Sequence, residues 1–283
     1  MDTQETPLPQ QNETAPSTSA EQIVRDFKPT SEVSFHHDEG RSFIETHRQV
    51  EMTDQEAFDY AVETFSLQGI TSTFDEEQRK EIIFEGREWK SKENIGGFGI
   101  TARGLDELEE VIPGVSEELL SQQGKIVFVG NGLSTAPVEI LQKLGTSAAP
   151  EIVLVDLFDY GALHQDLKRL KEQFDQKGVQ WPNDLNDKLI KSAALVEQIK
   201  LGKVKTVKYI LGDGNPPEEM RNADLMVNSF GPPEQTLHEQ IQCLKVAGRL
   251  FTSSRELPPT SQAKVTPIVS PDGKVASVAT RVV

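Results

Sequence analysis

The sequence contains a single cysteine, Cys243, among its 283 residues. One cysteine excludes an intrachain disulfide and any metal site built from several thiolates. Cys243 lies among apolar residues at helical spacing, where a free cysteine behaves as a small buried hydrophobic residue. We therefore expect neither a disulfide scaffold nor a thiol nucleophile.

Long apolar runs are missing too. No stretch reaches the roughly 18 apolar residues that a membrane-spanning helix needs. The segment after Met1 lacks the apolar centre of a signal peptide. The expected location is the cytoplasm, without membrane contact.

Basic residues are scarce: 29 Lys and Arg stand against 45 Asp and Glu, which gives a formal net charge of −16. Proteins bind phosphate backbones mainly through Lys and Arg. The charge balance therefore argues against nucleic acid as the main partner, and against anionic membrane surfaces. It leaves a small-molecule or protein substrate, and it does not determine the oligomeric state.

Metal-ligand clusters are also absent from the pattern. The nearest fragment is His36-His37-Asp38, but adjacent histidines point in different directions and no further ligand cluster accompanies them. We expect a surface loop there and no metal site.

The first third of the chain differs in composition from the rest. Residues 1–22 are mostly Pro, Ser, Thr, Gln and Glu, a composition that predicts a disordered tail. Residues 23–122 are expected to form a helical cap or lid. Within them, Thr53 with Glu56 and Thr73 with Glu76 have the spacing of capping boxes. Gly86 is expected to end the second helix, and 95–100 to form a glycine-rich loop.

A strand–turn–helix–strand pattern begins at residue 125. Lys125–Val129 and Ile152–Val155 are apolar, strand-length runs, and a glycine turn and a helical pattern separate them. Gly130 and Gly132 can adopt positive φ and allow a ligand to approach the backbone. Asp156 follows the second strand, where a carboxylate can accept hydrogen bonds from ribose hydroxyls. This βαβ unit predicts a site for a nucleoside-containing cofactor.

Further strands alternate with helices down to the C-terminus. We expect strands at 207–211, 225–227 and 249–252, with helices at about 160–203 and 233–246. An Asp-Gly pair between 264–269 and 275–280 predicts an antiparallel hairpin. Residues 123–283 should therefore form one α/β domain with a doubly wound, mostly parallel seven-stranded Rossmann-like sheet and a closing antiparallel hairpin.

These segments, in this order, resemble the class I S-adenosylmethionine-dependent methyltransferases over about residues 120–283. Val129-Gly130-Asn131-Gly132-Leu133-Ser134 is similar to the motif that surrounds the methionine part of the cofactor. Asp156 matches the acid that holds the ribose. Phe128 stands where the family usually has an acid, and Ser134 stands where it has a third glycine.

The resemblance implies S-adenosyl-L-methionine as cofactor and methyl transfer as activity. It also implies that Gly212-Asp213-Gly214 contacts the adenine and that Asn228-Ser229 lies near the reacting methyl. The cofactor-binding residues it implies are Val129, Gly130, Asn131, Gly132, Ser134, Asp156, Leu157, Asp213, Gly214, Asn228 and Ser229.

No catalytic residue is selected by this resemblance. The substrate nucleophile attacks the methyl group in line, and the enzyme supplies alignment and water exclusion. Such a transfer often needs no general base, and Asp159, Tyr160, His164 and His238 are equal candidates if one is used.

Two other functions stay open. A nicotinamide-dependent oxidoreductase would have the motif G-x-G-x-x-G beginning at Gly130, but the last position is Thr135. The closing hairpin also does not suit the all-parallel sheet of that class. A methyltransferase-like domain could also bind cofactor or a partner without chemistry. In the plainest reading, the glycines serve a tight turn and Asp156 caps the next helix.

Overall fold

The computed structural model describes residues 19–46, 52–64, 73–94, 98–145, 149–209, 211, 214–228, 233–253, 257–258, 260–269, 273 and 275–283. Among these residues, no helix is both long and apolar enough to cross a membrane.

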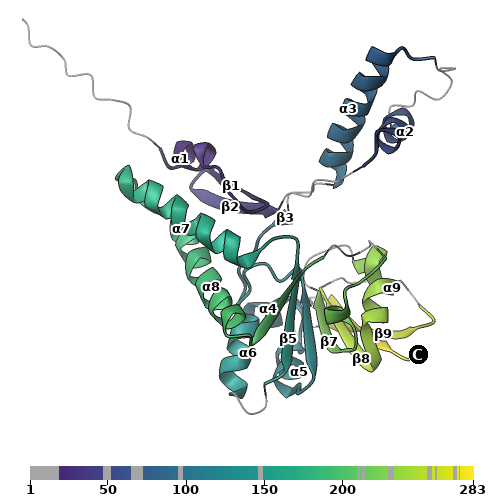
Figure 1. Ribbon diagram of the computed structural model, residues 1–283. Helices are drawn as coiled ribbons and strands as arrows, with labels where there is room; N and C mark the ends of the chain where they lie inside the picture. The colour runs from purple at the N-terminus through teal and green to yellow at the C-terminus, as the bar shows by residue number, and fades with distance from the viewer. Residues whose placement is uncertain are drawn as a thin grey trace, which may run out of the picture.

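A seven-stranded sheet forms the centre of the molecule, in the order β6-β5-β4-β7-β8-β10-β9 (Figure 1). The first five strands in this order are parallel, and β10 is antiparallel to both of its neighbours. The predicted doubly wound sheet with a closing antiparallel hairpin is confirmed. The strands are β4 Lys125–Val129, β5 Glu151–Asp156, β6 Val204–Lys208, β7 Ala223–Asn228, β8 Leu244–Thr252, β9 Ala263–Val269 and β10 Val275–Arg281.

Both faces of the central strands β4, β5 and β7 are buried, which explains their continuous apolar runs. Successive side chains of a strand point to opposite faces. Ile126 and Phe128 of β4 accordingly join one core cluster, while Val127 and Val129 join the other.

Helices cover both faces. On the Ile126 side the core takes residues from α4 Leu105–Val111, α5 Val115–Ser121, α6 Ala136–Leu144, α7 Tyr160–Gln176 and α8 Asn183–Lys200. On the Val127 side it takes residues from the short helix η1 Glu218–Met220 and from α9 Pro233–Cys243. Residues 105–121, which we expected in a cap, are therefore part of the main core.

A second, three-stranded sheet precedes this domain. It contains β1 Val33–Asp38, β2 Arg41–Thr46 and β3 Phe98–Gly99, and α1 Ala20–Asp26 comes before it. The expectation of a helical cap over 23–122 is wrong for residues 33–46, and His36-His37-Asp38 lies in a strand instead of a loop. The β1–β2 turn is Glu39-Gly40, both at positive φ (47° and 76°). A glutamate is rare in that conformation, so no clear hairpin signal precedes Gly40 in the sequence.

The start of the chain also differs from expectation at one point. Ser19 caps α1 by accepting a hydrogen bond from the Gln22 N–H at 3.2 Å. Order therefore begins at least four residues before the predicted end of the tail. Residues 1–18 lie outside the described residues.

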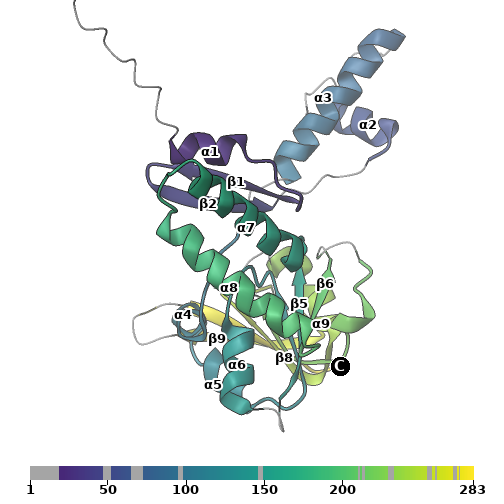
Figure 2. The same cartoon turned by 60° about the vertical axis from the view of Figure 1, so that its left-hand side comes forward.

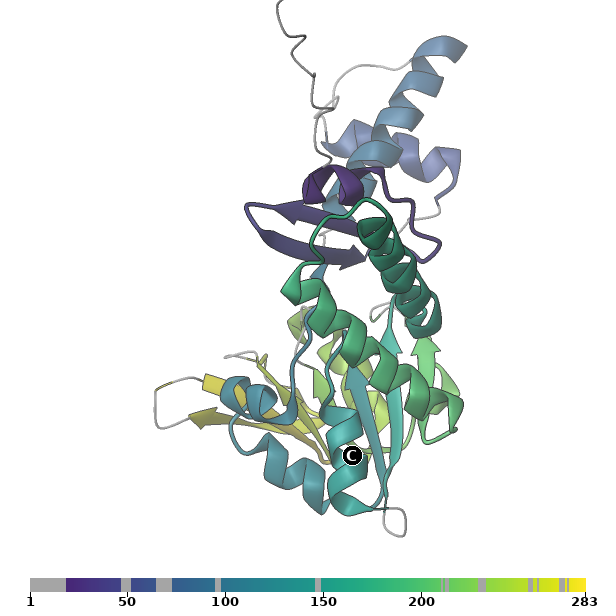
Figure 3. The same cartoon turned by 90° about the vertical axis from the view of Figure 1, so that its left-hand side faces the viewer.

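A helical hairpin is inserted between β2 and β3. It consists of α2 Asp54–Thr64 and α3 Glu76–Asn94, and it projects away from the seven-stranded sheet in all three views (Figure 3). The capping box at α2 is confirmed, since Thr53 N–H donates to Glu56 at 2.7 Å and Glu56 N–H donates back at 3.3 Å.

The second predicted box is displaced by two residues. Gln78 N–H donates to the Asp75 carboxylate at 2.9 Å, and Asp75 N–H donates to the Gln78 side chain at 3.2 Å. Gly86 does not end α3. A Cβ at that position would lie 2.0 Å from the Ala57 carbonyl oxygen. Gly86 thus lets α2 and α3 approach closely, and a glycine in the sequence does not distinguish that role from the end of a helix.

The three-stranded sheet and α1 are held on α7 and α8 (Figure 2). Asp166 of α7 is fully buried and accepts hydrogen bonds from the backbone N–H and hydroxyl groups of Thr30 and Ser31 at 2.5–3.0 Å. Arg169 also contacts Asp166 at 2.8 Å. Ser42 N–H donates to Asp184 of α8 at 2.6 Å.

Two strand boundaries are shifted from the prediction. β6 covers Val204–Lys208 instead of 207–211, because Tyr209 and Leu211 pack on the α9 side after the strand has ended. β8 starts at Leu244, earlier than the predicted 249. Its pairing with β7 shifts register between Ala223 and Leu225, and the residues of β8 at this irregularity include Ala247 at positive φ.

Candidate functional site

The carboxyl ends of β4, β5 and β7 meet where the strand order reverses. β4 is parallel to β5 on one side and to β7 on the other, and the chain continues outward in opposite directions from these neighbours. Ligands of open α/β sheets bind at such a switch point. The predicted cofactor residues of β4, β5 and β7 lie at this edge.

The turn after β4 has the backbone conformation expected of it. Gly130 and Gly132 have φ of 62° and 58°. Gly130 N–H donates to the Val155 carbonyl at 2.8 Å, which ties the turn to β5. The Asn131 amide nitrogen donates to the carbonyls of Gly132 (3.2 Å) and Ser134 (3.3 Å). The turn is therefore held by its own side chain.

One side of this turn is covered by the segment that enters α4. Leu133 N–H donates to the Thr101 carbonyl and Thr135 N–H to the Arg103 carbonyl, both at 2.7 Å. A Cβ on Gly132 would lie 2.7 Å from the Thr101 oxygen. The close backbone approach that we expected from a ligand at Gly132 is thus made by the protein's own chain. This contact could not be predicted from the sequence, since residues 101 and 132 are distant along the chain and neither is unusual.

Asp156 lies against the same turn and is only 8% exposed. Its carboxylate accepts a hydrogen bond from the Tyr160 hydroxyl. Burial raises the pKa of Asp156 to about 7, and hydrogen bonding, chiefly from Tyr160, opposes the rise only in part. Asp156 does not cap α7; Asp159 does so, by accepting from the Ala162 N–H at 2.6 Å.

Two buried polar atoms beside the turn have no hydrogen-bond partner in the described structure, Asn131 Oδ1 and Thr101 Oγ1. Asn131 is 3% exposed. Buried polar atoms are almost always satisfied. The unpaired acceptor and the unpaired hydroxyl next to the glycine turn therefore lack hydrogen-bond partners that a bound molecule would supply.

Asn228, at the end of β7, is buried at the level of Val129. Its amide nitrogen donates to Gln240 of α9 at 3.0 Å, and the Gln240 amide donates to Thr236 at 2.8 Å. These bonds fix the orientation of the Asn228 amide. Gln240 had no signal in the sequence because it follows a helix pattern like any other polar position.

The other predicted cofactor residues are distributed around this edge. Val129 is the buried last residue of β4, and Leu157, directly after β5, is partly exposed. Ser134 is buried and its hydroxyl accepts from the Ala136 N–H at 3.3 Å. Gly214 has a φ of 76° with no atom within 4 Å of a Cβ there. Asp213 and Ser229 lie outside the described residues.

The amino end of α6 is already occupied by protein groups. Besides the bonds from Leu133 and Thr135, the Glu139 carboxylate accepts from the Thr135 hydroxyl at 2.7 Å and from the Leu105 N–H at 3.2–3.3 Å. A pyrophosphate at a helix N-terminus needs free N–H groups and no competing anion. This end of α6 offers neither condition.

The candidate bases differ in burial and in their hydrogen-bond partners. His164 is buried and its Nδ1 lies 2.8 Å from the Ser192 hydroxyl, which itself donates to the Leu189 carbonyl at 2.8 Å. His164 Nδ1 must then carry the proton and donate, and burial lowers its pKa. It joins α7 to α8. His238 is exposed on α9, and Tyr160 is bonded to Asp156.

Within the part of the chain that the structure describes, no three His, Cys, Asp or Glu residues form a metal-binding group.

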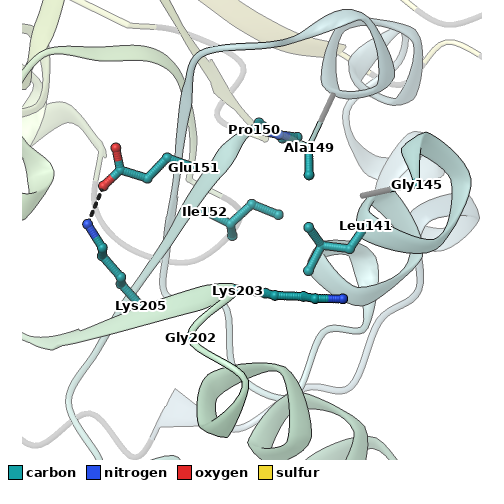
Figure 4. Close-up of a pocket in the computed structure, with 9 residues that line it drawn as sticks. All are labelled: Leu141, Gly145, Ala149, Pro150, Glu151, Ile152, Gly202, Lys203 and Lys205. Atoms are coloured by element: carbon teal, nitrogen blue, oxygen red, sulfur yellow. Dashed lines mark hydrogen bonds and ion pairs between the residues drawn. The ribbon is translucent and has the colours of Figure 1, made fainter. Parts of the chain in front are cut away.

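A pocket of about 360 Å³ lies at the opposite, amino-terminal edge of the sheet (Figure 4). It is lined by the end of α6, the start of β5 and the turn into β6. Its one ion pair joins Lys205 and Glu151 at 2.7 Å. Both side chains are largely exposed, and the pocket is far along the strands from the switch point. We interpret it as a surface hollow between helix ends.

Comparisons with known proteins add similarity in fold only. No protein-family model and no curated protein matches the chain. A methyltransferase from Geobacter sulfurreducens is 14% identical with a TM-score of 0.36, over 83% of this chain and 100% of that one. A mutant of MtNAS in complex with S-adenosylmethionine is 14% identical with a TM-score of 0.34, over 81% and 89%. TrmN from Thermus thermophilus is 12% identical with a TM-score of 0.35, over 85% and 83%.

At these identities and TM-scores the function has to be derived from the chain's own residues. The strand order, the glycine turn and Asp156 are the features that carry it.

Proposed function

We propose that this protein binds S-adenosylmethionine at the carboxyl ends of β4, β5 and β7 and transfers its methyl group to a small-molecule or protein substrate. The observation that carries the proposal is that Gly130 N–H donates to the Val155 carbonyl, which brings the Gly130–Gly132 turn beside Asp156 at the switch point of the sheet. These are two of the elements that the resemblance to class I methyltransferases requires, and they come from separate strands.

The residues present fit such a cofactor. Gly130, at positive φ, leaves the turn without a side chain on its partly exposed residue, Asp156 supplies a carboxylate for hydroxyl donors, and the unpaired Asn131 Oδ1 accepts a further hydrogen bond. When bound, S-adenosylmethionine supplies an electrophilic methyl group on a sulfonium. We assign the ribose to Asp156 and Leu157, and the methionine part to residues 129–134. The adenine is assigned to Asp213 and Gly214, and the acceptor side to Asn228 and Ser229.

In this proposal the chain's residues act by holding and orienting. Gln240 and Thr236 fix the Asn228 amide beside the turn, and the buried walls around Asp156 exclude water. Ordering both reactants in one geometry is the main source of rate in such transfers. None of the candidate bases is placed as an obligatory proton acceptor, so we assign no catalytic residue.

The occupied amino end of α6 separates this proposal from the nicotinamide-dependent alternative. A dinucleotide would bring a pyrophosphate to the Leu133–Thr135 N–H groups, which are already bonded to Thr101 and Arg103. The Glu139 carboxylate would repel it. S-adenosylmethionine has no phosphate and avoids both costs.

Isothermal calorimetry with S-adenosylmethionine and with NAD tests the proposal. We expect binding of the first in the micromolar range and none of the second. A radiolabelled methyl donor, incubated with pooled small-molecule and protein acceptors, then separates a transferase from a domain that binds without chemistry. Binding of NAD alone would contradict the proposal, and binding without transfer to any acceptor would restrict it to cofactor recognition.

A further inference from the structure

The Tyr160 hydroxyl occupies a position that a ribose hydroxyl would need. It donates to Asp156 Oδ2 from the first residue of α7, and both side chains are more than nine-tenths buried. The Tyr160 ring packs on Phe158, with centroids 4.9 Å apart. The carboxylate that should receive the cofactor is therefore covered from the α7 side.

Access to the Asp156 carboxylate is limited. Asp156 is only 8% exposed, and the Tyr160 hydroxyl already donates to Oδ2. Two neighbouring ribose hydroxyls held by one carboxylate would donate to both of its oxygens. The buried phenol therefore fills space beside Oδ2 that the second ribose hydroxyl would need.

Tyr160 is the group that has to give way. The glycine turn is fixed to β5 through Gly130 and to the 101–103 segment through Leu133. The phenol is held to the carboxylate by one hydrogen bond and packs on Phe158. A shift of this one side chain is therefore enough to free Oδ2.

We infer that Tyr160 competes with the cofactor ribose for Asp156, so that cofactor binding requires the Tyr160 hydroxyl to leave the carboxylate. This inference rests on the proposed function, because it needs a ribose at Asp156. Tyr160 then supplies Asp156 with a hydrogen bond in the free protein, and the loss of this hydrogen bond on binding lowers the affinity for the cofactor.

The test is calorimetric titration of S-adenosylhomocysteine into the wild-type protein and the Tyr160→Phe variant. Phenylalanine keeps the ring and removes the competing hydroxyl, so affinity should rise about tenfold, the equivalent of one charge-assisted hydrogen bond. The matched control is Tyr209→Phe, which removes the hydroxyl of another tyrosine–carboxylate pair, Tyr209 with Glu239. Its affinity should stay within about twofold of wild type, since that pair does not involve the Asp156 carboxylate and phenylalanine keeps the backbone hydrogen bond from residue 209 to the Asp156 carbonyl.

The outcomes separate the two claims. Equal or weaker binding by Tyr160→Phe, with measurable binding by the wild type, would overturn the competition and leave the cofactor assignment intact. Absence of binding by both proteins would remove the cofactor assignment and the competition with it. Binding by Tyr160→Phe alone would be the strongest support.

A second measurement covers the case in which Tyr160→Phe does not fold. The chain has three tyrosines, so 3-fluorotyrosine labelling gives three fluorine resonances. Tyr60→Phe and Tyr209→Phe identify two of them, and the third belongs to Tyr160. Saturation with S-adenosylhomocysteine should shift the Tyr160 resonance more than the other two. An unshifted Tyr160 resonance at saturation would overturn the inference.

Discussion

Asp156 is the residue on which the account depends most, and its burial has a consequence for stability. Its pKa is about 7 in the folded protein against 3.8 as the reference value. Between these values the folded protein binds more protons than the unfolded chain. The contribution of Asp156 to stability is therefore complete below pH 4 and is lost as the pH rises toward 7.

The first prediction follows from this sign. The free energy of unfolding of the wild type, minus that of Asp156→Asn, should fall by up to about 4 kcal/mol between pH 4 and pH 7 and stay level above pH 7. Urea unfolding at a series of pH values measures it. A difference that does not change over this range, or that rises, would show that Asp156 is not a buried acid with a raised pKa.

Gly132 gives a second prediction at the same scale. Its φ is positive and its Cβ position is filled by the Thr101 carbonyl. Gly178 has a similar φ of 64° with no atom within 4 Å of a Cβ. Gly178→Ala should cost about 1–2 kcal/mol from the backbone conformation, and Gly132→Ala about 1–3 kcal/mol more from the clash. Thermal unfolding of both variants without ligand is the measurement. Equal losses would mean that the 101–103 segment does not press on the turn.

The sequence indicated which residues to propose for the site but not what they bond to. Gly130, Gly132 and Asp156 could be named because they lie at, or within three residues of, the carboxyl end of an apolar strand, where ligands of such sheets bind. Tyr160 was visible only as one of several possible bases. The role proposed for Tyr160 depends on its position four residues after Asp156, across the β5–α7 turn, and on the burial of both side chains. The local sequence pattern does not indicate this burial. Thr101 was invisible for the same reason.

At the scale of elements, the Asp166 cluster holds the N-terminal segment on α7. Burial raises the pKa of Asp166, but hydrogen bonds from Ser31 and Thr30 outweigh it and the pKa lies below the ordinary value. A carboxylate that accepts this many bonds cannot be replaced by an amide, because the amide nitrogen would face donors.

We therefore predict that Asp166→Asn lowers the free energy of unfolding by about 3 kcal/mol and exposes residues 19–46 to hydrogen exchange. Asp175→Asn is the matched control on the same helix, since Asp175 forms an exposed pair with Lys171. Such a pair contributes less than about 1 kcal/mol. Equal effects of the two substitutions would contradict a buried contact between the N-terminal segment and α7.

Elements with strong periodicity were predicted well, and elements that depend on tertiary contacts were not. β4, β5 and the hairpin β9–β10 follow from apolar alternation and turn residues. β1 and β2 were missed because Glu39 replaces the usual turn residue. α3 was cut short at Gly86, where the glycine serves the contact with Ala57. A single sequence cannot show which distant residue a glycine has to accommodate.

At the scale of the whole molecule, the α2–α3 hairpin is the part whose role the sequence predicts as a lid. Thr46 and Phe98, which flank it, are paired neighbours in β2 and β3. A two-residue Asn-Gly turn can therefore join them directly, and residues 47–97 can be removed without opening the three-stranded sheet.

We predict that this deletion leaves thermal stability of the remaining protein nearly unchanged, because α2 and α3 pack mainly against each other. Turnover should fall by about tenfold or more if the hairpin closes the site. Removal of residues 1–18 is the control and should change neither property. Normal turnover of the protein without residues 47–97 would refute the lid.

The proposed function requires that a cofactor is held at the switch point through Asp156. Titration of S-adenosylhomocysteine into the wild type and Asp156→Ala at pH 8, where Asp156 is ionised, tests this claim most directly. We predict binding by the wild type and an affinity at least about tenfold lower for Asp156→Ala, since two charge-assisted hydrogen bonds are lost. Equal affinity of the two proteins would contradict the assignment of the ribose to Asp156.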